Sequence, residues 1–303
     1  MRPIKGLRRY LRTGLVAVIT LIVSLFAVTE ISREPLPSPS LKPNIKHKNV
    51  YIIFLNGLGC RYDRDLSEDL GFPGIRRSLA SAGYSFFDDH FLLYSYRGGQ
   101  VVDGKWQPKE YSAKDTGQPI SLSVSRLASL IDQFSLAHPE AKFILVGHSL
   151  GGRIALDFVS TTTPQNRQKI KGVITLNSPL LGVDIKVPEV THLLDYSNSL
   201  FASPAAKQLF REFNHWQEIA RMRRETIGEL QDDGLRVATF ATKQDLVVKP
   251  FTGCLLDERG NPVTEGFIVN VKAKGISIRE IFGHMGILEH QAVHRYITSL
   301  CLK

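Results

Sequence analysis

A serine enclosed by glycines is the residue of this sequence with the clearest chemical potential. Ser149 stands in GHSLGG (residues 147–152), after the apolar run KFILV and before a stretch with helical period. A sharp turn from a strand into a helix needs glycines, because its backbone passes close to neighbouring segments and a Cβ would clash. Such a turn exposes the serine hydroxyl near a helix N-terminus that favours negative charge. We therefore expect Ser149 to be a nucleophile; the alternative is a glycine-rich turn around a structural serine.

A serine hydroxyl is a weak nucleophile at neutral pH, so it needs a base, and imidazole is well tuned to take its proton. Of the nine histidines, His148 directly precedes Ser149, and we expect it to pack or to support the site. His284 lies in FGHMG (residues 282–286), between the last expected strand and the last expected helix. His290 and His294 fall within that helix, where a surface or packing role is expected. His284 is therefore one candidate for the base.

Short apolar runs and helical stretches alternate from residue 48 onward. Strands are predicted at 50–55, within 85–96, and at 142–147, 171–177, 235–242 and 266–273. Helices are predicted at 73–82, 122–138, 150–159 and 286–300. This alternation predicts an α/β fold with a mainly parallel central sheet and helices on both faces.

One segment interrupts the alternation. Residues 180–234 contain no clear strand, but a long helical pattern spans 204–230, with Leu209, Phe213, Trp216 and Ile227 close to one face. An insertion of this size predicts a helical cap or lid at about 180–234. Simple packing of a scaffold helix would produce the same pattern.

The motif GHSLGG after such a strand resembles the nucleophile elbow of the α/β-hydrolases, particularly of their lipase and esterase branch. The resemblance covers most of the chain from about Asn49 onward and implies the chain order Ser, then Asp or Glu, then His. It makes Ser149 the nucleophile, Asp245 the acid that orients the base, and His284 the base.

Asp245 fits the acid position because it follows the strand at 235–242, in a loop of the kind where the family carries its acid. Asp232 and Asp233 precede that strand, at the wrong end of the sheet. Asp257 is a weaker rival that lies in an expected turn.

The resemblance also implies an oxyanion hole made by two backbone N–H groups. One belongs to Leu150, directly after the nucleophile. The other comes from the loop NGLG (residues 56–59) after the first strand, where Leu58 is the first choice and Gly57 the second. Many members carry His-Gly where this chain has Asn-Gly, but the donor is a backbone group, so we expect the hole to survive. The strand-end segments 94–99 and 177–179 receive no catalytic role.

The N-terminus has the pattern of a targeting signal. A basic segment precedes the uncharged run Leu15–Val28, as in the secretory signals of exported proteins. The run is short for a membrane-spanning helix, which needs about 20 residues. Because the cleavage site is weak, an uncleaved signal anchor is an alternative. We expect a signal peptide or anchor at 1–31, a proline-rich linker at 32–48, and an exported hydrolase domain at 49–303.

Composition limits the remaining classes. The chain has 303 residues and a formal net charge of +9, much of it in the first dozen residues and in 30–48. It has no compact basic and aromatic constellation, so a nucleic-acid partner is not expected. Cys60, Cys254 and Cys301 are too few for a disulfide framework, although a Cys254–Cys301 bridge stays open in an exported domain. No metal-ligand set is visible, and the expected chemistry requires no cofactor.

These observations predict a serine hydrolase of carboxylic esters, with a lipid or another hydrophobic ester as substrate. Two alternatives remain open. One is a non-catalytic binding protein that keeps the α/β-hydrolase fold. The other is an acyltransferase or thioesterase that uses the same three residues. The acyl-chain length and the oligomeric state stay open.

Overall fold

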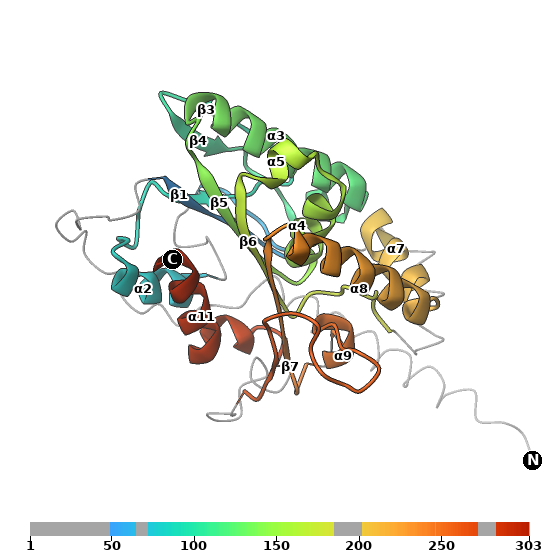
Figure 1. The fold of residues 1–303 in the computed structure, drawn as a ribbon. Helices are drawn as coiled ribbons and strands as arrows, with labels where there is room; N and C mark the ends of the chain where they lie inside the picture. The colour runs from blue at the N-terminus through green and yellow to red at the C-terminus, as the bar shows by residue number, and fades with distance from the viewer. Residues whose placement is uncertain (1–48, 65–71, 185–201, 246, 272–282, 303) are drawn as a thin grey trace, which may run out of the picture. The chain divides into compact units, whose positions relative to one another are not determined.

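The computed structural model describes residues 49–64, 72–184, 202–245, 247–271 and 283–302 (Figure 1). The predicted signal or anchor at 1–31 and the linker at 32–48 lie outside these ranges. Within the described ranges, no helix is both long and apolar enough to cross a membrane.

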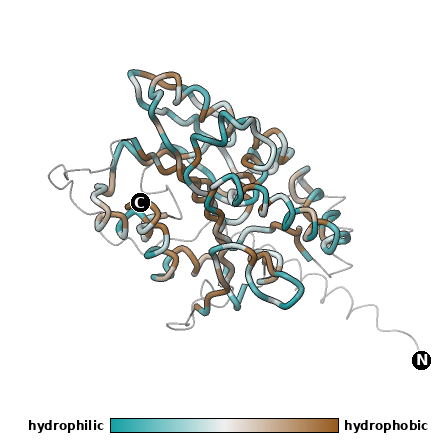
Figure 2. Tube along the Cα trace, viewed as in Figure 1, coloured by the Kyte–Doolittle hydropathy of each residue, from teal (hydrophilic) through white to brown (hydrophobic). Residues whose placement is uncertain are grey.

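In the part of the chain that the structure describes, six parallel strands form the central sheet, in the order β2-β1-β5-β6-β7-β8. The middle strands are almost wholly buried, as expected for a parallel sheet with both faces covered. Figure 2 shows hydrophobic residues along them. The predicted α/β class with a mainly parallel sheet is confirmed. The strands are β1 (Val50–Leu55), β2 (Phe91–Leu93), β5 (Lys142–His148), β6 (Ile170–Leu176), β7 (Arg236–Thr242) and β8 (Ile268–Val269).

Helices cover both faces of the sheet. On one face α3 (Ile120–Ala137), α4 (Leu150–Thr161) and α8 (Trp216–Asp232) pack on one another and on the strands; on the other lie α2 (Pro73–Ser78) and α11 (Gln291–Leu302) (Figure 1). The shorter helical elements are η2 (Leu79–Ala82), η3 (Ala113–Gly117), α5 (Pro164–Arg167), α7 (Pro204–Phe213), α9 (Pro250–Gly253) and η5 (Gly286–Glu289).

The order of the strands reverses at β1. From β1 the chain runs to β2 on one side, and it then crosses to β5 on the other side of β1. In an open parallel sheet, ligands bind at such a reversal, outside the carboxyl ends of the strands. The residues that follow β1 begin with Asn56 and Gly57, and the residue that follows β5 is Ser149. The sheet topology therefore brings these two loops together.

Most predicted elements are confirmed, with informative differences. The strands at 50–55, 142–147, 171–177 and 235–242 are present to within one residue, whereas the described part of 266–273, which ends at 271, contributes only the short β8. The helical pattern at 204–230 is two helices, α7 and α8, separated at Asn214 and His215. A hairpin of β3 (Gly99–Val102) and β4 (Lys105–Pro108) was not predicted, although Asp103-Gly104 is a strong hairpin signal.

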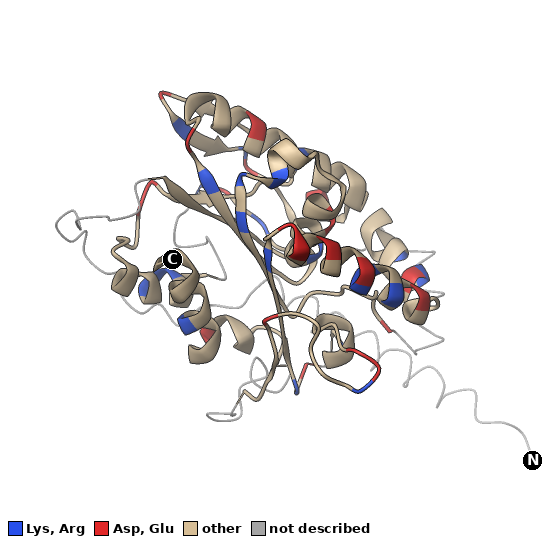
Figure 3. Ribbon diagram, viewed as in Figure 1, with Lys and Arg blue, Asp and Glu red and all other residues tan. Residues whose placement is uncertain are grey.

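The described part of the expected cap packs on the rest of the domain. Ile227 and Leu230 of α8 are buried in the main core, so this helix has the packing of a scaffold helix between β6 and β7. The Arg153 guanidinium of α4 donates hydrogen bonds to Asp157 at 2.8 Å and to Glu212 of α7 at 2.9 Å. Arg223 of α8 also donates to Asp157, at 2.8 Å. Figure 3 shows the charged residues along α8. Residues 185–201 lie outside the described ranges, and a lid role for 180–234 stays a prediction.

The three cysteines are free thiols, so the open Cys254–Cys301 bridge is not formed. Cys254 and Cys301 are buried, and Cys60 is half-buried. Burial raises the pKa of the Cys60 thiol to about 11, which keeps it protonated at neutral pH.

Candidate active site

Ser149 lies in the turn between β5 and α4, in a backbone conformation that non-glycine residues rarely adopt. Its φ is 53° and its ψ is −126°. Such a conformation costs about 1–3 kcal/mol and persists only where the surroundings enforce it. The Ser149 amide donates a hydrogen bond to the Leu176 carbonyl of β6 at 2.9 Å. A Cβ on Gly151 would overlap with the carbonyl oxygen of Leu55, which explains a glycine at this position of the motif. The predicted strand–turn–helix context is present.

The loop after β1 lies against the Ser149 side chain. A Cβ built on Gly57 would be 2.7 Å from the Cβ of Ser149 and 3.2 Å from its Oγ. The preceding residue, Asn56, is buried, and its carbonyl accepts a hydrogen bond from the Tyr96 hydroxyl at 2.7 Å. The Gly59 amide donates to Thr116 Oγ1 at 2.9 Å. The segment expected to supply an oxyanion-hole amide therefore lies beside the candidate nucleophile and is held on both sides.

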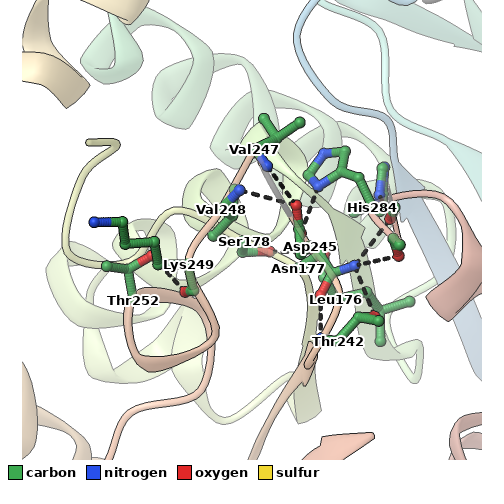
Figure 4. Close-up of polar contacts among 12 residues, drawn as sticks. Leu176, Asn177, Ser178, Thr242, Asp245, Val247, Val248, Lys249, Thr252 and His284 are labelled. Atoms are coloured by element: carbon green, nitrogen blue, oxygen red, sulfur yellow. Dashed lines mark hydrogen bonds and ion pairs between the residues drawn. The ribbon is translucent and has the colours of Figure 1, made fainter. Parts of the chain in front are cut away.

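His284 and Asp245 form a buried pair. The Nδ1 atom of His284 lies 2.7 Å from the Oδ2 atom of Asp245, and both side chains are almost inaccessible to solvent (Figure 4). The other carboxylate oxygen of Asp245 accepts hydrogen bonds from the amides of Val247 at 2.8 Å and Val248 at 2.9 Å. Both oxygens thus have partners, so the carboxylate is held in one orientation with one oxygen toward the imidazole.

His148 connects this pair with the nucleophile turn. Its ring packs against the ring of His284, with the centroids 4.7 Å apart, and its Nε2 lies 3.0 Å from the His284 carbonyl oxygen. Because a carbonyl can only accept, Nε2 carries the proton in this bond. Burial, together with the neighbouring His284 ring, lowers the pKa of His148 to about 3, although the bond to the carbonyl acts in the opposite direction. His148 is therefore neutral. Because it directly precedes Ser149, its contacts with His284 link the buried pair to the nucleophile turn.

The residues that sequence analysis set aside have other partners. His294 Nε2 donates to the Leu288 carbonyl at 2.7 Å. The Oδ1 atom of Asp257 accepts the amides of Arg259 and Asn261, both at 2.8 Å, and so stabilises its own turn. Asp233 forms an exposed ion pair with Arg167 at 2.8 Å. These contacts explain the three residues as structural.

Sequence analysis missed Asn177, which it left without a role at the end of β6. The Asn177 side chain is fully buried and donates a hydrogen bond to the His284 carbonyl at 2.9 Å (Figure 4). A polar residue directly after a strand that neighbours the nucleophile strand was the available signal, because site residues gather at the carboxyl ends of such strands.

The arrangement has the parts required for nucleophilic chemistry. A serine on a strained turn begins a helix, whose N-terminal amides favour developing negative charge. A buried imidazole, that of His284, packs against the ring of the residue before this serine, and a buried carboxylate binds the nitrogen on one side of its ring. A carboxylate in that position fixes the tautomer of an imidazole base and stabilises the imidazolium that forms.

One protein-family model matches the central part of the chain. A family model described as Hydrolase_4, serine aminopeptidase, S33, matches residues 115–240, a segment that includes the turn of Ser149. No curated protein sequence matches the chain.

Several solved structures are similar in fold. A lipase-esterase related protein from Clostridium acetobutylicum is 14% identical, with a TM-score of 0.43, over 85% of this chain and 96% of that chain. A monoacylglycerol lipase from Paleococcus ferrophilus is 16% identical, with a TM-score of 0.45, over 83% and 93%. A phospholipase, PlaB, from Legionella pneumophila is 10% identical, with a TM-score of 0.50, over 84% and 59%.

Proposed function

We propose that this chain, a member of the α/β-hydrolase superfamily, is a serine hydrolase that cleaves carboxylic esters with hydrophobic acyl groups. The observation that carries the proposal is the buried Asp245–His284 pair, whose imidazole packs against the ring of His148, the residue before Ser149. A structural serine would need neither a strained backbone nor an imidazole and carboxylate pair beside it.

In the proposed reaction, Ser149 Oγ attacks the ester carbonyl carbon while the Nε2 atom of His284 takes the hydroxyl proton. Asp245 keeps the other ring nitrogen protonated and stabilises the imidazolium. The carbonyl oxygen becomes an oxyanion, which the amides of Leu58 and Leu150 bind. The bond to the alcohol oxygen then breaks, and the alcohol leaves with the proton from His284. Water, deprotonated by His284, attacks the acyl-enzyme, releases the carboxylic acid and restores Ser149.

The preference for hydrophobic acyl groups is supported by aromatic residues near the loop of Asp245. Phe251 follows that loop in α9, and its ring lies 5.1 Å from the Trp216 ring and 6.4 Å from the Phe213 ring, centroid to centroid. All three side chains are only half-buried. Lys249 Nζ lies 5.6 Å from the Phe213 ring centroid, but the half-buried Phe251 and Trp216 suit a hydrocarbon chain better than a charged group.

The test is hydrolysis of p-nitrophenyl esters, from acetate to palmitate, by the full-length protein in mild detergent. Ser149→Ala is expected to abolish turnover and labelling by a fluorophosphonate probe, because both require the hydroxyl. Ser125→Ala, which removes an exposed serine of α3, is the matched control and is expected to behave as wild type. Activity that rises with chain length would support the hydrophobic preference.

Two outcomes would overturn the proposal. If the acyl group passed to an added alcohol, amine or thiol in preference to water, the chain would be an acyltransferase. If folded wild-type protein hydrolysed no ester and took up no fluorophosphonate, the binding-protein alternative would replace the enzyme.

A further inference from the structure

We infer that Asn177 and His148 are positioning residues for His284: from the ends of β6 and β5 they hold its carbonyl oxygen, and so fix where its imidazole stands relative to Ser149. The inference rests on the proposed function and adds a second set of residues to it. Neither side chain is required to touch the substrate.

Asn177 ties three parts of the site together. Its side-chain amide nitrogen lies 2.9 Å from the His284 carbonyl oxygen, 3.2 Å from the Gly283 carbonyl oxygen and 3.0 Å from Thr242 Oγ1. Its Oδ1 atom accepts the Thr242 amide at 2.7 Å. The end of β6 is thereby bonded both to the end of β7 and to the loop of His284 (Figure 4).

The backbone of Asn177 is adapted to this task. Its φ is 47°, in the left-handed region that Asn enters more readily than most residues. The Asn177 amide donates to the Phe240 carbonyl of β7 at 2.9 Å, which anchors the residue in that conformation. The Asn177 side chain is fully buried and has four polar partners, so the backbone conformation and these hydrogen bonds together hold it in one orientation.

His148 holds the same carbonyl from the neighbouring strand. Its Nε2 donates to the His284 oxygen at 3.0 Å, next to the bond from Asn177 at 2.9 Å. A carbonyl oxygen has two lone pairs, so these two donors saturate it. Because buried His148 stays neutral, it supplies one N–H without adding a positive charge beside the imidazolium that forms on His284.

The site needs such bonds because His284 lies outside any strand or helix. A residue in regular structure is held by ladder or helix hydrogen bonds, whereas a loop carbonyl depends on side chains or water. In a proton transfer over hydrogen-bond distance, a displacement of about 1 Å can reduce the rate about 100-fold. The hydrogen bonds from Asn177 and His148 hold the His284 carbonyl oxygen in place of the backbone hydrogen bonds that a strand or helix would supply.

The test measures kcat and KM on the best p-nitrophenyl ester, together with Tm. Asn177→Gly removes the side chain and accepts the positive φ without strain. Asn177→Asp keeps the shape and the acceptor for the Thr242 amide but replaces the donating nitrogen with oxygen. Both are expected to lower kcat about 100-fold, with KM changed less than about threefold. Asn166→Gly, which alters a half-buried asparagine of α5 outside the site, is the matched control and is expected to match wild-type kcat.

His148 provides an independent pair of variants, which also serves if the Asn177 variants fold poorly. His148→Gln retains a terminal N–H donor and is expected to keep most of kcat. His148→Leu lacks the donor and is expected to lose about tenfold. Because both side chains act on one carbonyl, the combined Asn177→Gly and His148→Leu loss should be smaller than the product of the single losses.

The contrary results are distinct. If folded Asn177→Gly and Asn177→Asp kept kcat within about twofold, or changed KM alone, the positioning role would be overturned while the proposed function stood. Multiplicative losses in the double variant would overturn the shared action on one carbonyl. If the wild type were as inactive as Ser149→Ala, the proposed function would fail first.

Discussion

A Cβ atom placed on Gly57 would lie 2.7 Å from the Cβ of Ser149, closer than two unbonded carbons can approach. The two residues are far apart in sequence and meet because β1 and β5 are neighbouring parallel strands. Gly57 is therefore required because a side chain there would overlap with the serine side chain. The requirement comes from space and does not depend on the backbone φ angle of Gly57.

This relationship predicts that Gly57→Ala disables the site without unfolding the protein. The added methyl group must displace Ser149 or the loop after β1, so kcat/KM and the rate of fluorophosphonate labelling should each fall about 100-fold or more. The matched control is Gly228→Ala in α8, where a Cβ would meet nothing within 4 Å. That variant should keep full activity and gain about 0.5–1 kcal/mol of stability from helix propensity.

Asp245→Asn should abolish most activity while preserving the fold. An asparagine can still accept the amides of Val247 and Val248 through its oxygen. It would then present an NH₂ group to Nδ1 of His284, which favours the wrong imidazole tautomer. We expect kcat to fall by about 10⁴-fold, with little change in Tm. Asp257→Asn, in an exposed turn, is the comparison; a similar loss there would contradict the assignment of the acid.

Ser149→Gly should make the protein more stable than Ser149→Ala. Both variants lack the hydroxyl, but only glycine adopts the observed φ of 53° and ψ of −126° without steric cost. The expected difference is about 1–3 kcal/mol in the free energy of unfolding, measured by urea denaturation. Equal stabilities would show that the turn is not strained.

His148 should make stability depend on pH. Burial, with the neighbouring His284 ring, lowers its pKa from 6.5 to about 3, so between these values the unfolded chain binds one more proton at this residue than the folded chain. The free energy of unfolding must therefore decrease as pH falls below about 6.5, by up to about 1.4 kcal/mol per pH unit from this residue alone. Urea denaturation of His148→Gln should show a shallower decrease, whereas exposed His215→Gln should retain the wild-type slope.

The Arg153 network should contribute to stability, and its contribution should disappear in acid. Burial acts to raise the pKa of Glu212, but the hydrogen bonds and positive charge of Arg153 outweigh it and leave the pKa below 4.5. The stabilisation is thus present above about pH 4.5 and is lost as pH falls through the lower, folded value.

Glu212→Ala should lower the free energy of unfolding by about 3 kcal/mol near neutral pH, since it removes one partner of a buried guanidinium. Lys105→Ala, which breaks an exposed pair with Asp89, should leave the free energy of unfolding nearly unchanged. Similar effects of the two substitutions would show that burial does not strengthen the Arg153 network.

Local patterns in the sequence were sufficient for most elements and for the strand–turn–helix context of Ser149, the proposed nucleophile. The run Val50–Leu55 has the composition of a strand buried on both faces, and it forms β1 with those bounds. The glycines around Ser149 are required by contacts within the turn and with the adjacent strand. The Asp103-Gly104 turn is another local pattern, and it carried a signal for the β3–β4 hairpin. The bounds of the two-residue β8 could not be predicted from the sequence, because the apolar pattern at 266–273 extends beyond the two residues that pair with β7.

The meeting of distant residues required the tertiary structure. His284 and Asp245 were identified as candidates from their places after predicted strands, but the 2.7 Å bond between them depends on the arrangement of the loops that follow β7 and precede α11. Asn177 had no local signal for its partners, which lie more than 100 positions away at Gly283 and His284. Hydropathy and turn patterns report interactions over a few residues. Strand order, and therefore which strand ends share one edge of the sheet, follows from packing of the whole domain.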